Sequence, residues 1–149
     1  MKILSILVAL FLLTASAHAA SPLLVYSYGN QITSSTLAIS SDGTVVHTER
    51  VHAHLEVVNE NPLSGAELAN LKSLVAKAAQ AKVTKKSISA SLGSRSGTIS
   101  TYVNGVKKDL EGVVRVPTDL SKATRLTNSS SSIKAIKTLI NRIVKVDLP

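Results

Sequence analysis

The sequence contains no cysteine, no tryptophan and a single phenylalanine in 149 residues. Without cysteine the chain forms no disulfide, offers no thiolate to a metal and holds no cysteine nucleophile. Its fold must therefore be stabilised by packing alone, although many exported domains of this size rely on disulfides. The scarcity of aromatic residues argues against binding of single-stranded nucleic acid, because such proteins stack bases on aromatic side chains.

Acidic residues are also few, with 9 Asp and Glu against 17 Lys and Arg. Residues 20–70 carry five acids and one base, whereas residues 71–149 carry fifteen bases and four acids. A basic half of this kind indicates an anionic partner, such as a lipid head group, an envelope polymer or an acidic protein face. A surface charge that only keeps the protein soluble would give the same composition.

The only long apolar run lies at the N-terminus, over residues 3–13, and is followed by Ala17-His18-Ala19. This pattern is typical of a secretory signal peptide with small residues at the cleavage site. The run is shorter than the roughly 20 residues that a membrane-spanning helix needs. We therefore expect a signal peptide at residues 1–19 and a single domain at residues 20–149, exported to a periplasm or an extracellular space and not transmembrane.

Two segments of the remaining chain predict helices. Ser64-Gly65-Ala66-Glu67 is a capping box, and apolar residues then recur at three- and four-residue spacing to about Ala81. A second apolar stripe of the same period runs from Ile133 to Val144, after a serine run of which Ser131 or Ser132 is expected to cap the helix.

The other segments predict strands. Residues 23–28 and 32–40 are rich in strand-forming residues, and residues 44–58 predict one long third strand with a bulge near Arg50. Asn104-Gly105 predicts a tight turn between strands 98–103 and 106–110, and 113–116 extends the sheet. Residues 85–97, rich in Ser, Lys and Gly, predict an exposed loop. The order predicts an α+β fold of two layers, with two helices on one face of a mainly antiparallel sheet.

Alternate residues of a strand share a face, so a continuous third strand would place His52, His54 and Glu56 together. Two imidazoles and a carboxylate form a legitimate set of zinc or copper ligands. The same alternation turns Val51, Leu55 and Val57 toward the core and leaves the three polar side chains in water. We therefore predict no metal and keep these three residues as the alternative.

Catalytic motifs are incomplete. The segment 93–97 has Arg95 where a nucleophile elbow requires serine, and the S-x-x-K of 131–134 lacks the other elements of penicillin-binding enzymes. No phosphate-binding glycine loop occurs. The sequence therefore predicts a protein that is not an enzyme and carries no cofactor.

The layout resembles that of the emfourin-type protease inhibitors, small bacterial proteins that inhibit thermolysin-like metalloproteases. The similarity lies in a strand pair over 32–58, a capped helix over 64–81, a hairpin over 98–110 and a C-terminal helix over 133–146. The resemblance implies protease inhibition through a macromolecular interface, and it assigns no inhibitory residue.

We therefore expect an exported binding protein whose partner is a macromolecule, with a protease as the partner that the resemblance implies. The alternative is an envelope-associated protein that holds anionic lipid or polymer through its basic loop. In that case four bases in or beside the loop are the candidates for anion binding, because no acid lies near them: Lys82, Lys85, Lys86 and Arg95.

Overall fold

The computed structural model describes residues 21–30, 32–91 and 93–145, so the expected signal peptide at 1–19 lies outside the described residues. The elements, in chain order, are β1 Pro22–Gly29, β2 Thr33–Ser40, β3 Val45–Val51, β4 His54–Asn59, α2 Gly65–Gln80, β5 Val83–Ser89, β6 Ser96–Val103, β7 Val106–Val116, β8 Asp119–Asn128 and α3 Ser132–Val144.

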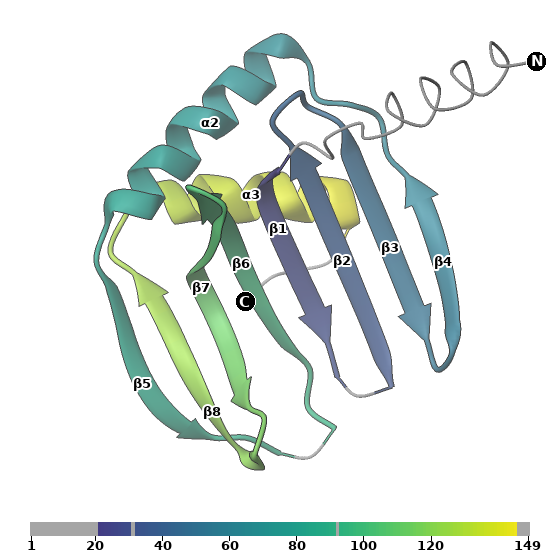
Figure 1. The fold of residues 1–149 in the computed structure, drawn as a ribbon, viewed down its shortest axis with the longest axis vertical. Helices are drawn as coiled ribbons and strands as arrows, with labels where there is room; N and C mark the ends of the chain where they lie inside the picture. Colours follow the sequence, from purple (N-terminus) through teal and green to yellow (C-terminus); the bar gives the residue numbers. More distant parts are fainter. Residues whose placement is uncertain (1–20, 31, 92, 146–149) are drawn as a thin grey trace, which may run out of the picture.

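The strands form one open sheet of 8 strands in the order β4-β3-β2-β1-β6-β7-β8-β5 (Figure 1). Every neighbouring pair is antiparallel. The prediction of an α+β fold with a mainly antiparallel sheet is confirmed. Within the described part of the chain, neither helix is long and apolar enough to span a membrane.

One hydrophobic core joins the sheet to both helices, and it is almost entirely aliphatic. Its buried members are Leu24, Tyr26, Leu37, Ile39, Val45, Leu71, Val75, Ala78, Ile99, Leu110, Ile133, Ile136, Ile140 and Val144. Burying a side chain such as Leu or Ile stabilises a fold by about 1.5–3 kcal/mol before entropy is counted. This packing stabilises the fold, which has no disulfides to do so.

The predicted first helix begins as expected, with a complete capping box. The Glu67 amide donates to Ser64 Oγ at 3.3 Å, and the Ser64 amide donates to Glu67 Oε2 at 3.0 Å. Arg142, in the last turn of α3, donates to the other carboxylate oxygen of Glu67 at 2.6 Å. The bond from the Ser64 amide, and then the Arg142 guanidinium, lower the pKa of Glu67 to about 2. One carboxylate therefore caps α2 and links it to α3.

The predicted serine cap of α3 is wrong. Ser131 already has helical backbone angles, φ −61° and ψ −20°, and its side chain makes no capping bond. A capping side chain works from an extended backbone, which places its oxygen over the next amides. Ser130 Oγ accepts from the Ser132 amide at 3.2 Å instead, and Asn128 Oδ1 accepts from the Ser130 amide.

The predicted long strand over 44–58 is wrong, because the chain reverses at His52–Ala53. Val51 pairs with His54, so β3 and β4 are the two arms of a tight hairpin. His52 takes φ 54°, a left-handed conformation that His adopts more readily than bulky residues do. The side chains predicted to face the core are exposed: Val51 by 53%, Leu55 by 61% and Val57 by 54%. The reversal carries no glycine or proline, and alternation alone does not reveal it.

The predicted loop over 85–97 is also wrong in its first half. Residues 83–89 form β5, an edge strand whose backbone pairs with β8 from Val83–Asn128 to Ser89–Lys122. Tertiary pairing overrides the weak strand propensity of this Lys- and Ser-rich segment. The hairpin at Asn104-Gly105 is confirmed, with φ 52° and 77° at the two turn residues.

Candidate functional site

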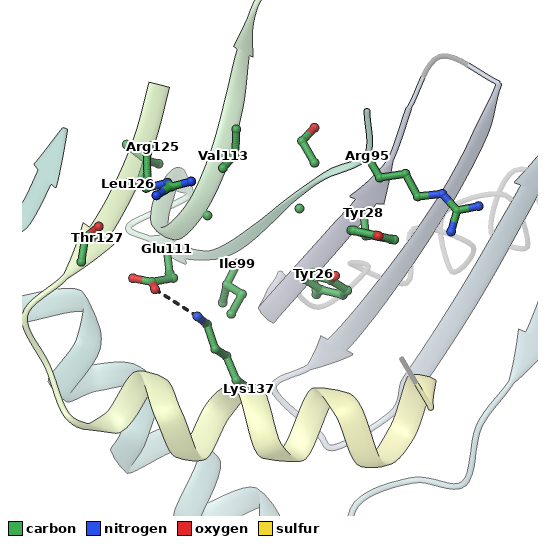
Figure 2. Close-up of a pocket in the computed structure, with 13 residues that line it drawn as sticks. Tyr26, Tyr28, Arg95, Ile99, Glu111, Val113, Arg125, Leu126, Thr127 and Lys137 are labelled. Atoms are coloured by element: carbon green, nitrogen blue, oxygen red, sulfur yellow. Dashed lines mark hydrogen bonds and ion pairs between the residues drawn. The ribbon is translucent and has the colours of Figure 1, made fainter. Parts of the chain in front are cut away.

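A pocket of about 410 Å³ opens between β1, β6, β7, β8 and α3 (Figure 2). Its walls combine apolar side chains with an excess of cations. The aromatic and charged residues that line it are Tyr26, Tyr28, Arg95, Glu111, Arg125 and Lys137. Ligand sites are commonly concave and apolar, with a few polar groups that fix orientation, and this pocket has that composition.

Two tyrosines form one side of the pocket. Tyr26 and Tyr28 stand two residues apart on β1, so their side chains share a face of the strand. The rings stack with centroids 6.2 Å apart and an angle of 16° between their planes. Gly97 on β6 pairs with Tyr28, and a Cβ at Gly97 would lie 3.0 Å from Tyr28 Cδ2. The missing side chain therefore leaves the space that both rings occupy.

The Tyr26 hydroxyl is buried without a hydrogen-bond partner among the described residues. The whole residue is only 2% exposed. Burial, with the neighbouring Tyr28 as a smaller cause, raises the pKa of Tyr26 above its ordinary value. A buried hydroxyl left unpaired costs about 1–3 kcal/mol, so a fold rarely retains one without a reason.

Arg95 lies over the ring of Tyr28. Its guanidinium carbon is 5.9 Å from the centre of the Tyr28 ring, within the range of a cation–π contact. Side-chain donors from β7 and from the residue after β1 hold the segment that carries Arg95. Arg115 donates to the carbonyls of Ser91 and Ser94, at 2.9 and 2.6 Å, and Asn30 Nδ2 donates to the Gly93 carbonyl at 3.0 Å.

The remaining charges come from α3, β7 and β8. Lys137 Nζ reaches from α3 to Glu111 Oε1 at 3.1 Å, and the second oxygen of Glu111 accepts the Asn128 amide at 2.7 Å. Figure 2 shows Arg125 on the side of the pocket opposite the tyrosines, with Lys137 rising from the helix. Three cations and one carboxylate line the pocket, so its net charge is positive.

The four predicted anion-binding residues do not form one cluster. Only Arg95 lies at the pocket. Lys85 and Lys86 are exposed on the edge strand β5, where adjacent residues point to opposite faces of the sheet. Lys82 is exposed before that strand, and its carbonyl accepts the Ser129 amide.

The predicted alternative metal set is also divided. His52 occupies the turn between β3 and β4, whereas His54 and Glu56 lie on β4, and all three are exposed. Among the described residues no group of three or more His, Asp or Glu side chains is placed to hold a metal ion. The premise of a shared strand face therefore fails for His52.

A separate polar cluster surrounds His47, which the sequence analysis did not use. The ring is buried, and its Nε2 lies 2.8 Å from Ser35 Oγ. Glu49 approaches the same nitrogen at 3.6 Å, and Glu60 approaches Nδ1 at 3.7 Å. These contacts connect β2, β3 and the segment after β4.

Sequence reasoning missed most of the pocket, namely Tyr26, Tyr28, Arg125 and Lys137. A signal was present, because two of the three tyrosines after residue 20 are spaced to share one face of a predicted strand. Arg125 gives no signal, since the sequence predicts no helix or strand around it.

No protein-family profile, curated protein or solved structure matches this chain.

Proposed function

We propose that this chain is an exported binding protein that holds an amphiphilic anion in the pocket beside Tyr26, and that it does not transform that ligand. The observation that carries the proposal is the buried Tyr26 hydroxyl, a hydrogen-bond donor without a partner on the wall of a positively charged pocket. An oxyanion of the ligand would accept that donor.

The chemistry of the walls supports this class of ligand. Arg95 and Arg125 favour a carboxylate, phosphate or sulfonate, because guanidinium groups bind planar or tetrahedral oxyanions through several donors. Ile99, Val113 and Leu126 offer an apolar surface to the remainder of the molecule. A fully polar anion would leave that surface unused.

Binding without conversion is supported by the state of Glu111. Both of its oxygens are engaged, one by Lys137 and the other by the Asn128 amide. These two bonds give Glu111 a structural role, that of linking α3 and the end of β8 to β7. The pocket then offers donors and charge for recognition.

Access to Tyr26 requires a movement of Tyr28. The Tyr26 oxygen is closed to solvent, whereas Tyr28 is half-buried and has Arg95 above it. We infer that Tyr28 and Arg95 turn aside together as the ligand enters. We also infer that α2 and α3 lie on the same face of the sheet as the pocket, since they contact each other and α3 supplies Lys137.

The test uses 8-anilinonaphthalene-1-sulfonate as the probe, an aromatic anion that fluoresces when bound in an apolar site. We expect one probe per chain, and at least about tenfold weaker binding in Arg95→Gln/Arg125→Gln, since each charged hydrogen bond contributes about 1.5–3 kcal/mol. Lys85→Gln/Lys86→Gln, with the same change in charge on β5, is the matched control and should bind normally. Equal loss in both variants would contradict a specific pocket, as would retention of affinity in Arg95→Gln/Arg125→Gln.

Protease inhibition is a second proposal, and it rests on the β3–β4 hairpin. The exposed side chains of Val51, Leu55 and Val57 on this extended hairpin suit the cleft of a protease, which binds extended segments. Residual activity of a thermolysin-like metalloprotease after incubation with the protein tests it. Inhibition that is lost in Leu55→Asp/Val57→Asp and kept in Arg95→Gln/Arg125→Gln would support it. Full protease activity at excess protein would refute it.

A further inference from the structure

The sheet ends in two strands whose outer edges have no partner strand among the described residues. β4 pairs only with β3, and β5 pairs only with β8 (Figure 1). An open edge presents backbone donors and acceptors that can pair with another strand. The two edges are close in length, with 6 residues in β4 and 7 in β5.

The directions of β4 and β5 allow the two strands to pair between two copies of the chain. Each strand is antiparallel to its neighbour, and the sheet has 8 strands, so β4 and β5 run in opposite directions. When a second copy is placed so that its sheet continues the first, its β5 lies antiparallel to β4 of the first copy. The junction would repeat the pairing found throughout the sheet.

The charges of the two edges are opposite. β5 carries the exposed bases Lys85 and Lys86 and no acid. β4 carries the exposed Glu56, and Glu49 lies directly across from it on β3. A pair of β4 edges would bring carboxylates together, and a pair of β5 edges would bring lysines together. Only the mixed pair, β4 with β5, places opposite charges across the junction.

The exposed apolar side chains of β4 also favour a partner at this edge. Leu55 and Val57 are more than half exposed on β4, although natural edge strands usually carry charge instead. The aliphatic stems of the β5 lysines can cover apolar surface while their ammonium groups remain in water. From these observations we propose that β4 of one copy binds β5 of a second copy of this chain. Because the two surfaces differ, copies join head to tail, in an open chain or in a ring of more than two copies. This inference is independent of the pocket.

The experiment measures self-association by sedimentation velocity, with protein expressed from the full-length sequence and purified from the exported fraction. The native protein should associate at low ionic strength, with an average mass that rises with concentration beyond that of a dimer. High ionic strength should weaken the association, because exposed charges are screened. A native protein that stays monomeric at every concentration and at low ionic strength would overturn the inference. It would show that the lysines of β5 prevent other strands from pairing with this edge.

Charge reversal tests the junction itself. Glu56→Lys alone and Lys85→Glu/Lys86→Glu alone should both stay monomeric, since each places like charges across the junction. An equal mixture of the two variants should associate again, because each edge then meets an edge of opposite charge. Lys72→Glu/Lys134→Glu, which reverses exposed helix lysines, is the control and should associate like the native protein.

Three further results, all with the charge-reversal variants, would overturn the inference. One is an equal mixture that stays monomeric although circular dichroism shows both variants folded. Another is self-association of Lys85→Glu/Lys86→Glu that equals that of the native protein. The third is a plateau at the mass of a dimer in Glu56→Lys, which would indicate pairing of two like edges, β4 with β4 or β5 with β5.

Discussion

Tyr26 on β1 is a diagonal neighbour of Gly97 on β6, and a Cβ at Gly97 would lie 3.1 Å from the Tyr26 hydroxyl oxygen. The absence of one side chain on β6 thus determines where the tyrosines on β1 can lie. The pocket depends on this fit, because Tyr26 and Tyr28 form one of its sides.

Gly97→Ala should therefore disturb the pocket and the core together. The added methyl group displaces the tyrosine rings, and overpacking of this kind costs about 1–3 kcal/mol. Urea unfolding and probe titration measure the two effects. Gly65→Ala is the control, since a Cβ at Gly65 meets nothing within 4 Å. Unchanged stability in Gly97→Ala would show that the rings move aside at no cost.

Arg115→Gln should weaken probe binding although Arg115 does not line this pocket. Its guanidinium holds the carbonyls of Ser91 and Ser94, and the segment that they belong to carries Arg95. Removing these charged hydrogen bonds frees the segment, so Arg95 spends less time over Tyr28. We expect a loss of affinity of about threefold to tenfold, consistent with a charged hydrogen bond of about 1.5–3 kcal/mol of which only part is transmitted. An Arg95→Gln/Arg115→Gln variant should bind no more weakly than Arg95→Gln alone, and additive losses would contradict this positioning role.

Glu67 predicts a dependence of stability on acid pH. Its pKa falls from 4.5 to about 2 in the folded protein, chiefly through the bond from the Ser64 amide and then through Arg142. A carboxylate with a lowered pKa stabilises the fold at pH values above its unfolded pKa, and this contribution is lost as the pH falls toward 2. The melting temperature of Glu67→Gln should thus lie below that of the native protein at pH 6 and converge with it near pH 2. A difference that stays constant over this range would show that the charge of Glu67 is not responsible.

Tyr26 predicts the opposite dependence at alkaline pH. Burial raises its pKa in the folded protein above the ordinary value of 10.0. In the unfolded chain the hydroxyl ionises near pH 10, so the folded state binds more protons above that pH and loses stability as the pH rises. Urea unfolding between pH 9 and about 11 should show a steeper decline in the native protein than in Tyr26→Phe. Parallel declines would show that another group is responsible.

The parts of the fold that the sequence predicts are those with a local signal. The capping box at Ser64 and the turn at Asn104-Gly105 are each specified by a few adjacent residues, and both are confirmed. The reversal at His52 and the strand β5 have no such signal. The first uses a left-handed histidine. The second exists because its backbone pairs with β8, which lies far along the chain, as in the pair Lys85 and Leu126.

The pocket is harder to predict than the elements, because it depends on contacts between residues that are distant in the sequence. Arg95 was singled out for its charge, and the structure places it over Tyr28. The sequence does not reveal that Lys137 would meet Glu111, 26 residues earlier, or that Gly97 would leave room for the tyrosines. The order of strands in the sheet decides these contacts.

The most direct test of a ligand site at Tyr26 is the stability of Tyr26→Phe, measured with and without saturating 8-anilinonaphthalene-1-sulfonate. Without the probe, the variant should be about 1 kcal/mol more stable than the native protein, because an unpaired buried hydroxyl has been removed. With the probe, the native protein should gain more stability than the variant, because only its hydroxyl can donate to the sulfonate. The gain rises with the logarithm of the ratio of free probe concentration to Kd, so tighter binding gives a larger gain. Circular dichroism during urea unfolding gives both numbers. A variant that is no more stable alone, or that gains as much from the probe as the native protein, would contradict the claim that the Tyr26 hydroxyl is kept for a ligand.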